Sequence, residues 1–223
     1  MPDLRLLISR SVVVRLVVIL AVVLLVPGVP GVRADDAATA ASAQAVVKSF
    51  ADEGVSLLED RSASAAVRAE RFRGLLRRYF ATEVIARWVL GRHWNQFDAQ
   101  ERDEYYRLFE DLVVYGYAKR FGEYTGQRLR IVRTVVDSDN QATVFSEIDR
   151  PGGGGQPISV DWRVGGRADV FRIVDVVVEN VSLSQTWRSD FSATIQQSGR
   201  PAALLDTLRA RTAALKAEVG VSN

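Results

Sequence analysis

The chain has 223 residues, of which 48% are hydrophobic and 25% charged, which fits one or two globular domains and excludes a disordered chain. It contains no Cys and a single His, so disulfides, thiolate metal sites and sites that need two imidazoles are excluded. The formal net charge is +2, but residues 1–34 hold four arginines against one aspartate and leave −1 for the rest, so nucleic acid is not indicated as a partner.

Residues 1–34 have the layout of a secretory signal peptide. Three arginines precede an apolar run over residues 16–26, a Pro-Gly pair ends that run, and Val32 and Ala34 occupy the −3 and −1 positions of a cleavage site. The run is 11 residues long, whereas a helix that spans a bilayer needs about 20. We therefore expect export, cleavage after Ala34 and a single domain formed by residues 35–223.

The first half of the exported chain is predicted to be helical, because apolar residues recur every three or four positions. Helices are expected over residues 42–59, 64–80 and 83–90. A longer helix is expected to begin at the capping-box pattern of residues 98–101 and to continue to about Tyr124.

The period of the apolar residues then changes to two, which predicts β-strands. Four strands are expected over residues 129–135, 142–149, 158–164 and 168–178, separated by short turns. Sequential strands with such turns form an antiparallel meander with one solvent-facing side. The glycine run 152–155 lies between two strands with no Lys-Ser or Lys-Thr after it, so we expect a hairpin loop and not a phosphate loop.

Two more helices are predicted to close the chain. In the first, Trp187, Phe191 and Ile195 repeat every four residues, and the second opens with Arg200-Pro201. Helices, then strands, then helices indicate an α+β fold of the NTF2/cystatin-like outline, a twisted antiparallel sheet of about four strands with helices packed on one face.

Catalytic patterns are sparse in this sequence. His93 is expected to be a surface or helix-terminal residue, because a lone His seldom catalyses without a partner, and no Gly-x-Ser-x-Gly motif occurs. Cone-shaped α+β folds do host isomerases that use a buried Asp and a Tyr donor. Asp161, Asp175, Tyr105 and Tyr117 could supply those groups, although the alternation turns Asp161 towards solvent. An isomerase therefore remains the minor alternative, and no cofactor or metal is expected.

Three stretches occur in an order and spacing that point to one family. They are residues 87–94 (RWVLGRHW) followed by 100–105, residues 112–126, and residues 178–183 (VENVSL) continuing through 188–191. Together they resemble the MlaC/toluene-tolerance family of periplasmic phospholipid-binding carriers over nearly all of residues 42–215. The family commonly has Gly where this chain has Asn180, and Asn tolerates the left-handed backbone that a turn needs. The Arg-rich composition is also similar to a hopanoid-associated branch.

The resemblance implies that the sheet and helices enclose a deep apolar pocket, which acyl chains fill while the head group stays at the mouth. The residues carried over as lipid contacts are Val89, Leu90, Phe109, Val113, Tyr117 and Phe121 on helices, with Val144, Val160, Trp162, Val181 and Leu183 on the sheet side. It also implies a periplasmic lipid carrier that is not an enzyme. Its cargo would be phospholipid, or a hopanoid in that branch. Its partners would be an outer-membrane lipoprotein complex and an inner-membrane ABC-type transporter with a substrate-binding ring, and its role the maintenance of membrane lipid asymmetry.

Overall fold

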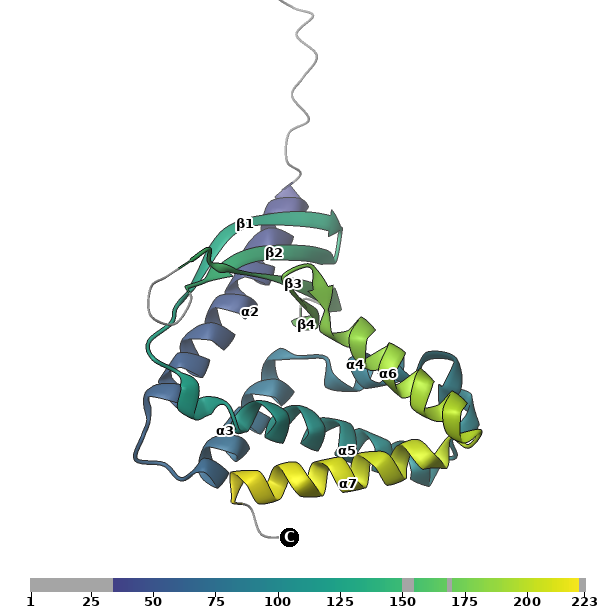
Figure 1. Ribbon diagram of the computed structural model, residues 1–223. Helices are drawn as coiled ribbons and strands as arrows, with labels where there is room; N and C mark the ends of the chain where they lie inside the picture. Colours follow the sequence, from purple (N-terminus) through teal and green to yellow (C-terminus); the bar gives the residue numbers. More distant parts are fainter. Residues whose placement is uncertain (1–33, 150–154, 168–169, 221–223) are drawn as a thin grey trace, which may run out of the picture. The chain divides into compact units, whose positions relative to one another are not determined.

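The structure is a computed structural model that describes residues 34–149, 155–167 and 170–220 (Figure 1). The predicted signal peptide before Ala34 and most of the glycine run lie outside these residues. The helices are α2 (Ala34–Glu59), α3 (Ala65–Tyr79), α4 (Thr82–Leu90), η1 (Gly91–Gln96), α5 (Ala99–Ala118), η2 (Phe121–Glu123), α6 (Leu183–Ser198) and α7 (Ala202–Val219). The strands are β1 (Leu129–Ser138), β2 (Gln141–Ile148), β3 (Ile158–Arg167), β4 (Val170–Val178) and β5 (Val181–Ser182).

The strands form one antiparallel sheet in the order β1-β2-β3-β4-β5, which confirms the predicted meander and adds the two-residue strand β5. Glu179 and Asn180 form the turn between β4 and β5, with φ angles of 48° and 66°. Asn180 thus has the left-handed backbone expected of it. Alternate residues on β2, β3 and β4 are buried, as a sheet with one covered face requires.

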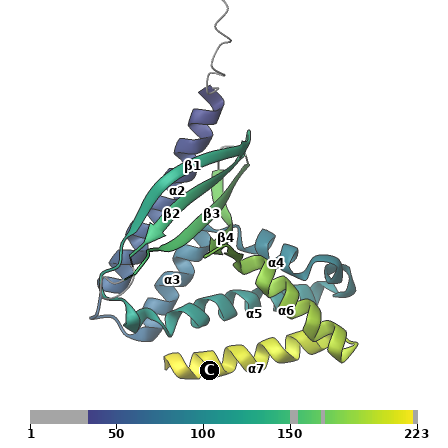
Figure 2. The same ribbon diagram turned by 45° about the horizontal axis from the view of Figure 1, so that its top comes forward.

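The helices are arranged in two groups. Helix α2 contacts β1, β2, β3 and β4, and Figures 1 and 2 show it running along the sheet. Helices α4 to α7 pack mainly on one another, through the pairs α5–α7 and α4–α6, and α3 joins the two groups by packing on both α2 and α5. None of the described helices is long and apolar enough to cross a bilayer.

Three details differ from the sequence prediction. Helix α2 begins at Ala34 and not near residue 42, because the Ala-rich stretch favours helix. Helix α5 does start with the expected capping box at Asp98, but it ends at Ala118. Gly122 and Gly126 disfavour its continuation, and the chain proceeds through the short 3-10 helix η2. His93 follows the end of α4 as expected, yet its ring is buried beside Gln96 and not at the surface.

Most of the buried apolar residues in the described part of the chain fall into two clusters. The helical cluster consists of Ala69, Leu76, Ile85, Ala86, Val89, Leu90, Phe97, Tyr105, Phe109, Leu112, Val114, Tyr115, Ala118, Phe191, Ile195, Leu204, Leu205, Leu208, Leu215 and Val219. The sheet cluster consists of Ala43, Val47, Ala142, Val144, Val160, Trp162, Val164 and Ile173. Tyr105, fully buried in the helical cluster, donates its hydroxyl hydrogen to the Ala86 carbonyl at 2.9 Å, so its polar end costs little to bury.

Candidate functional site: an apolar cavity

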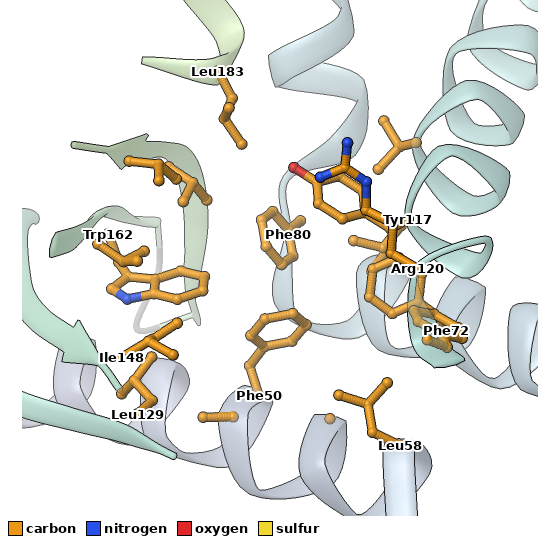
Figure 3. Close-up of a pocket in the computed structure, with 18 of the residues that line it drawn as sticks. Phe50, Leu58, Phe72, Phe80, Tyr117, Arg120, Leu129, Ile148, Trp162 and Leu183 are labelled. Atoms are coloured by element: carbon orange, nitrogen blue, oxygen red, sulfur yellow. The ribbon is translucent and has the colours of Figure 1, made fainter. Parts of the chain in front are cut away.

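A cavity of about 600 Å³ lies between the helical and sheet clusters (Figure 3). Its volume falls within the roughly 300–1,000 Å³ of ordinary small-molecule sites. Its apolar wall consists of Phe50, Ala51, Gly54, Val55, Leu57 and Leu58 on α2; Phe72, Leu76, Phe80 and Ile85 on or beside α3 and α4; Phe109, Val113, Tyr117, Phe121 and Tyr124 on or after α5; Leu129, Ile148, Ile158, Val160, Trp162, Val176 and Val178 on the sheet; and Leu183 and Trp187 on α6.

Aromatic rings separate the two clusters on the sheet side of the cavity. The Phe50 ring meets Phe80 and Trp162 edge-on, with centroid distances of 5.1 and 5.6 Å. Trp162 donates its Nε1 hydrogen to Ser146 Oγ at 2.9 Å, and Ser146 Oγ donates to the Val160 carbonyl at 2.7 Å. The indole is therefore held by hydrogen bonds at one edge while its other edge lines the cavity (Figure 3).

The opposite wall is formed by α3 and the end of α5. Phe72 packs against Phe121 and Tyr117, with ring centroids 5.4 and 6.2 Å apart. Although 39% of Tyr117 is exposed, burial raises the pKa of its hydroxyl. The two observations are compatible, because part of the side chain is open at the cavity mouth while the apolar rings packed beside it disfavour the phenolate.

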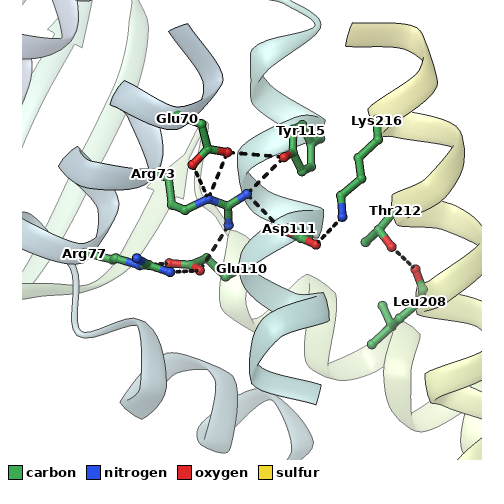
Figure 4. Close-up of polar contacts among 9 residues, drawn as sticks. All are labelled: Glu70, Arg73, Arg77, Glu110, Asp111, Tyr115, Leu208, Thr212 and Lys216. Carbon is green, nitrogen blue, oxygen red and sulfur yellow. Dashed lines mark hydrogen bonds and ion pairs between the residues drawn. The ribbon is translucent and has the colours of Figure 1, made fainter. Parts of the chain in front are cut away.

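Two carboxylates in the cavity wall are already paired. Glu110 accepts hydrogen bonds from Arg73 and Arg77, within a network that also joins Asp111 of α5 to Lys216 of α7 (Figure 4). This network joins α3, α5 and α7 behind the cavity wall. Glu110 therefore lines an apolar space without being an uncompensated charge.

Asp175 on β4 is the other paired carboxylate. Its Oδ1 accepts from Ser184 Oγ at 2.6 Å and from the Ser184 backbone N–H at 3.2 Å. Its Oδ2 accepts from Ser182 Oγ at 2.7 Å and from Arg163 at 3.2 Å. Asp175 thus orients the first turn of α6 and has no oxygen left unpaired to act as a base towards Tyr117. The isomerase alternative gains no support from this arrangement, since Tyr105 and Asp161 do not line the cavity.

The cavity opens to solvent where its lining residues are exposed. Among the described lining residues, those classed as exposed are Tyr117, Arg120, Glu123 and Asp149, and the first three follow one another at the end of α5. Gln127 also lines this end. The wall is thus mostly apolar inside, where its two carboxylates are paired, and has exposed polar groups at one mouth. This arrangement suits a ligand with a long apolar part and a polar end.

Comparisons with known proteins identify the family. Residues 48–210 match the family model described as MlaC protein. The chain belongs to the MlaC family. The predicted family and the predicted α+β class are thereby confirmed.

Two relatives of this MlaC-family chain can be named. The intermembrane phospholipid transport system binding protein MlaC of Haemophilus influenzae is 23% identical over 132 residues, which are 58% of this chain. The match spans 59% of that relative's length. A phospholipid-binding protein from Ralstonia solanacearum, solved in complex with a phospholipid, superimposes with a TM-score of 0.68 at 20% identity, covering 78% of this chain and 98% of the other. At that identity the superposition establishes the shared fold.

The structure brings together seven of the residues that the family resemblance assigned to lipid contact. These are Phe109, Val113, Tyr117, Phe121, Val160, Trp162 and Leu183. The other four lie outside the cavity wall. Val89 and Leu90 are buried in the helical cluster and Val144 in the sheet cluster, whereas Val181 is 56% exposed. Apolar character alone could not separate residues at a cluster's surface from those at its centre.

The sequence reasoning missed the contribution of α2 and α3. Phe50, Leu58, Phe72 and Phe80 are large wall residues in this MlaC-family chain, yet the three recognised stretches begin only at residue 87. Phe50 and Phe72 do lie within the helices predicted over residues 42–59 and 64–80.

Proposed function

We propose that this chain is a periplasmic phospholipid-binding transport protein that holds acyl chains in the cavity and is not an enzyme. The observation that carries the proposal is the cavity of about 600 Å³, whose wall is mostly apolar inside and polar at the mouth. Family membership supports it, and so do the two relatives, one a phospholipid transport system binding protein and the other a phospholipid-binding protein solved with a phospholipid.

The energetics of burial favour transfer by docking. A diacyl lipid has around 30 methylene groups, and burial at about 0.8 kcal/mol each contributes roughly 24 kcal/mol against water. This exceeds the practical limit of about 18–21 kcal/mol for non-covalent affinity, so ordering and cavity costs must reduce it. Release into water would still be very slow. The lipid should therefore pass directly to another apolar site at little net cost.

Such transfer requires membrane partners on both sides of the periplasm. We propose an outer-membrane lipoprotein complex and an inner-membrane ABC-type transporter with a substrate-binding ring, with lipid asymmetry as the result. Residues 1–34, as a signal peptide cleaved after Ala34, would deliver residues 35–223 to that compartment as one lipid-binding domain. The alternative within the family is a carrier of hopanoids in place of phospholipids.

Native mass spectrometry of the protein produced from the full-length gene, purified from a periplasm without detergent, tests the proposal. We expect a bound mass that organic extraction identifies as phospholipid; a hopanoid would favour the alternative. Val113→Asp places a charge on the cavity wall and should abolish lipid retention in a protein that remains folded by circular dichroism. Val181→Asp is the matched control, because Val181 is exposed outside the cavity and should keep its lipid.

Two results would contradict the proposal. One is a wild-type protein that carries no lipid and takes none up from phospholipid vesicles. The other is a folded Val113→Asp variant with unchanged lipid content, which would place the lipid outside the cavity.

A further inference from the structure

The segment between α5 and β1 contributes the polar part of the cavity wall. Arg120, Glu123, Tyr124 and Gln127 all line the cavity there, and Arg120 is the one cationic residue among the described lining residues. Apolar chains inside the cavity would leave the polar end of a lipid against this segment.

The guanidinium of Arg120 is uncommitted. Within the described part of the chain it makes no ion pair and no side-chain hydrogen bond, whereas the arginines behind the two interior carboxylates are paired: Arg73 with Glu110 and Arg163 with Asp175. Its positive charge opposes the burial that raises the pKa of the Tyr117 hydroxyl. Figure 3 shows Arg120 and Tyr117 on the helix side of the cavity, opposite Trp162.

A second unpaired donor lies four residues further along. The Tyr124 hydroxyl is buried and has no hydrogen-bond partner among the described residues, and Tyr124 lines the same cavity. Buried hydroxyl groups are almost always hydrogen-bonded, so this one calls for an acceptor, which a ligand supplies once the side chain turns its hydroxyl into the cavity. The Arg61 guanidinium reaches the Tyr124 carbonyl at 3.4 Å, which adds another cation just outside the wall.

We propose that Arg120 and Tyr124 bind the phosphate of the carried lipid. The planar guanidinium can donate two parallel hydrogen bonds to non-bridging phosphate oxygens, and the phenol can donate a third. The inference rests on the proposed function and specifies its ligand: the polar end must carry a phosphate, which a hopanoid without phosphate lacks. The acyl chains would then extend from the mouth towards Phe50 and Trp162.

The neighbouring carboxylates reduce the positive charge around the proposed phosphate subsite. Glu123 and Asp149 are exposed lining residues, so the mouth is not a strongly positive surface. Arg120 would therefore recognise phosphate by direct contact once the chains are seated. Free inorganic phosphate, which has no chains to bury, should not be held.

The test compares two lipids with identical acyl chains, a phosphatidylethanolamine and a diacylglycerol, in uptake from vesicles by delipidated protein from the full-length gene. Wild type should prefer the phospholipid. Arg120→Gln should reduce that preference at least about tenfold, with diacylglycerol uptake unchanged, because only the charge-assisted bonds are lost. Arg120→Lys should retain part of the preference, since an ammonium supplies the charge without the bidentate geometry of a guanidinium. Tyr124→Phe should lower the preference for phospholipid less than Arg120→Gln does.

Arg107→Gln is the matched control, because Arg107 is an exposed arginine of α5 that does not line the cavity. The subsite is overturned if Arg120→Gln keeps the full preference, if Arg107→Gln loses as much, or if millimolar inorganic phosphate blocks phospholipid uptake as a competing ligand. Failure of wild type to take up either lipid overturns the proposed function itself. Equal uptake of both lipids by wild type overturns the phosphate subsite alone.

Discussion

Helix α5 contributes similar apolar residues to two regions: the helical cluster, which is tightly packed, and the cavity wall, which borders open space. Val114 is 0% exposed in the helical cluster, while the adjacent Val113 is half-buried and faces the cavity. Helical residues one position apart point about 100° away from each other, so one helix can complete a solid core and line a hollow. The comparison shows that the cavity is not a packing defect of a single core. It is a space lined by members of both clusters, which are bridged beside it by Phe80.

Such a space persists only if the elements around it are held apart. At one side the Phe50 ring meets Phe80 and Trp162 edge-on, so bulky rings from α2, the α3–α4 connection and β3 pack together at this edge of the cavity. At the other side, the ion-pair network of Arg73 fixes α3 against α5 (Figure 4). Empty apolar volume is unfavourable in a folded protein. A ligand that fills it should therefore stabilise the fold.

The largest loss of stability is expected when Arg73, the centre of the ion-pair network behind the cavity wall, is replaced. Arg73 is 11% exposed in its side chain, lies 3.1 and 2.9 Å from Glu110 and Asp111, and donates to the Tyr115 hydroxyl at 3.2 Å. Arg73→Met should lower the free energy of unfolding by about 3 kcal/mol, because two partly buried carboxylates lose a shared partner.

Arg77→Met is the matched control for Arg73, since Arg77 pairs with the same Glu110 but its side chain is 64% exposed. Its loss should cost less than about 1 kcal/mol. Urea denaturation of both variants measures the difference. Equal destabilisation would show that the network adds nothing beyond surface ion pairing.

An intermediate loss of stability is expected from a pair of variants that compares the helical cluster with the cavity wall directly. Val114→Ala removes two methyl groups from a fully packed site and should cost about 2 kcal/mol of unfolding free energy. Val113→Ala removes the same groups from the cavity wall and should cost less than half as much. Thermal or urea unfolding of delipidated protein measures both. If the two variants lose equal stability, Val113 is packed as tightly as Val114 and the cavity is filled in solution.

The architecture was predictable because it depends on periodicity. The change from a helical period to a period of two after residue 126 predicted where the sheet begins, and the alternation in residues 142–164 predicted which face is covered. The family resemblance places Asn180 where Gly is common, and Asn tolerates the left-handed backbone that this position adopts, with a φ of 66°. Each of these features is encoded over a few neighbouring residues.

The cavity itself was only half predictable, for a physical reason. Whether a valine is core or wall depends on what lies beyond its side chain, and sequence distance does not contain that information. Val144 and Val160 follow the same alternation, yet Val160 lines the cavity and Val144 does not. The end of α5 was also predicted six residues too late, so Arg120 and Tyr124 could not be recognised as part of a mouth.

The smallest expected effect concerns the connection from α2 to α3, beside the cavity wall. Hydrogen bonds from the Ser62 hydroxyl and then from Arg71 lower the pKa of Asp60 from 3.8 to about 2. Because the folded pKa lies below the unfolded one, the carboxylate stabilises the fold above about pH 4, and this contribution disappears as the pH falls from about 4 to 2. Amides of residues 60–64 should then exchange faster with solvent, while those around Tyr105 in the helical cluster do not. Hydrogen exchange at pH 4.5 and 2.5, corrected for the intrinsic exchange rate, measures how much faster each amide exchanges at the lower pH. In the Asp60→Asn variant the amides of residues 60–64 should exchange fast at both pH values, so the pH dependence disappears. A uniform acceleration across both regions would instead mean that α2, α3 and the helical cluster open as one unit, and that the wall of the cavity is no less stable than the core behind it.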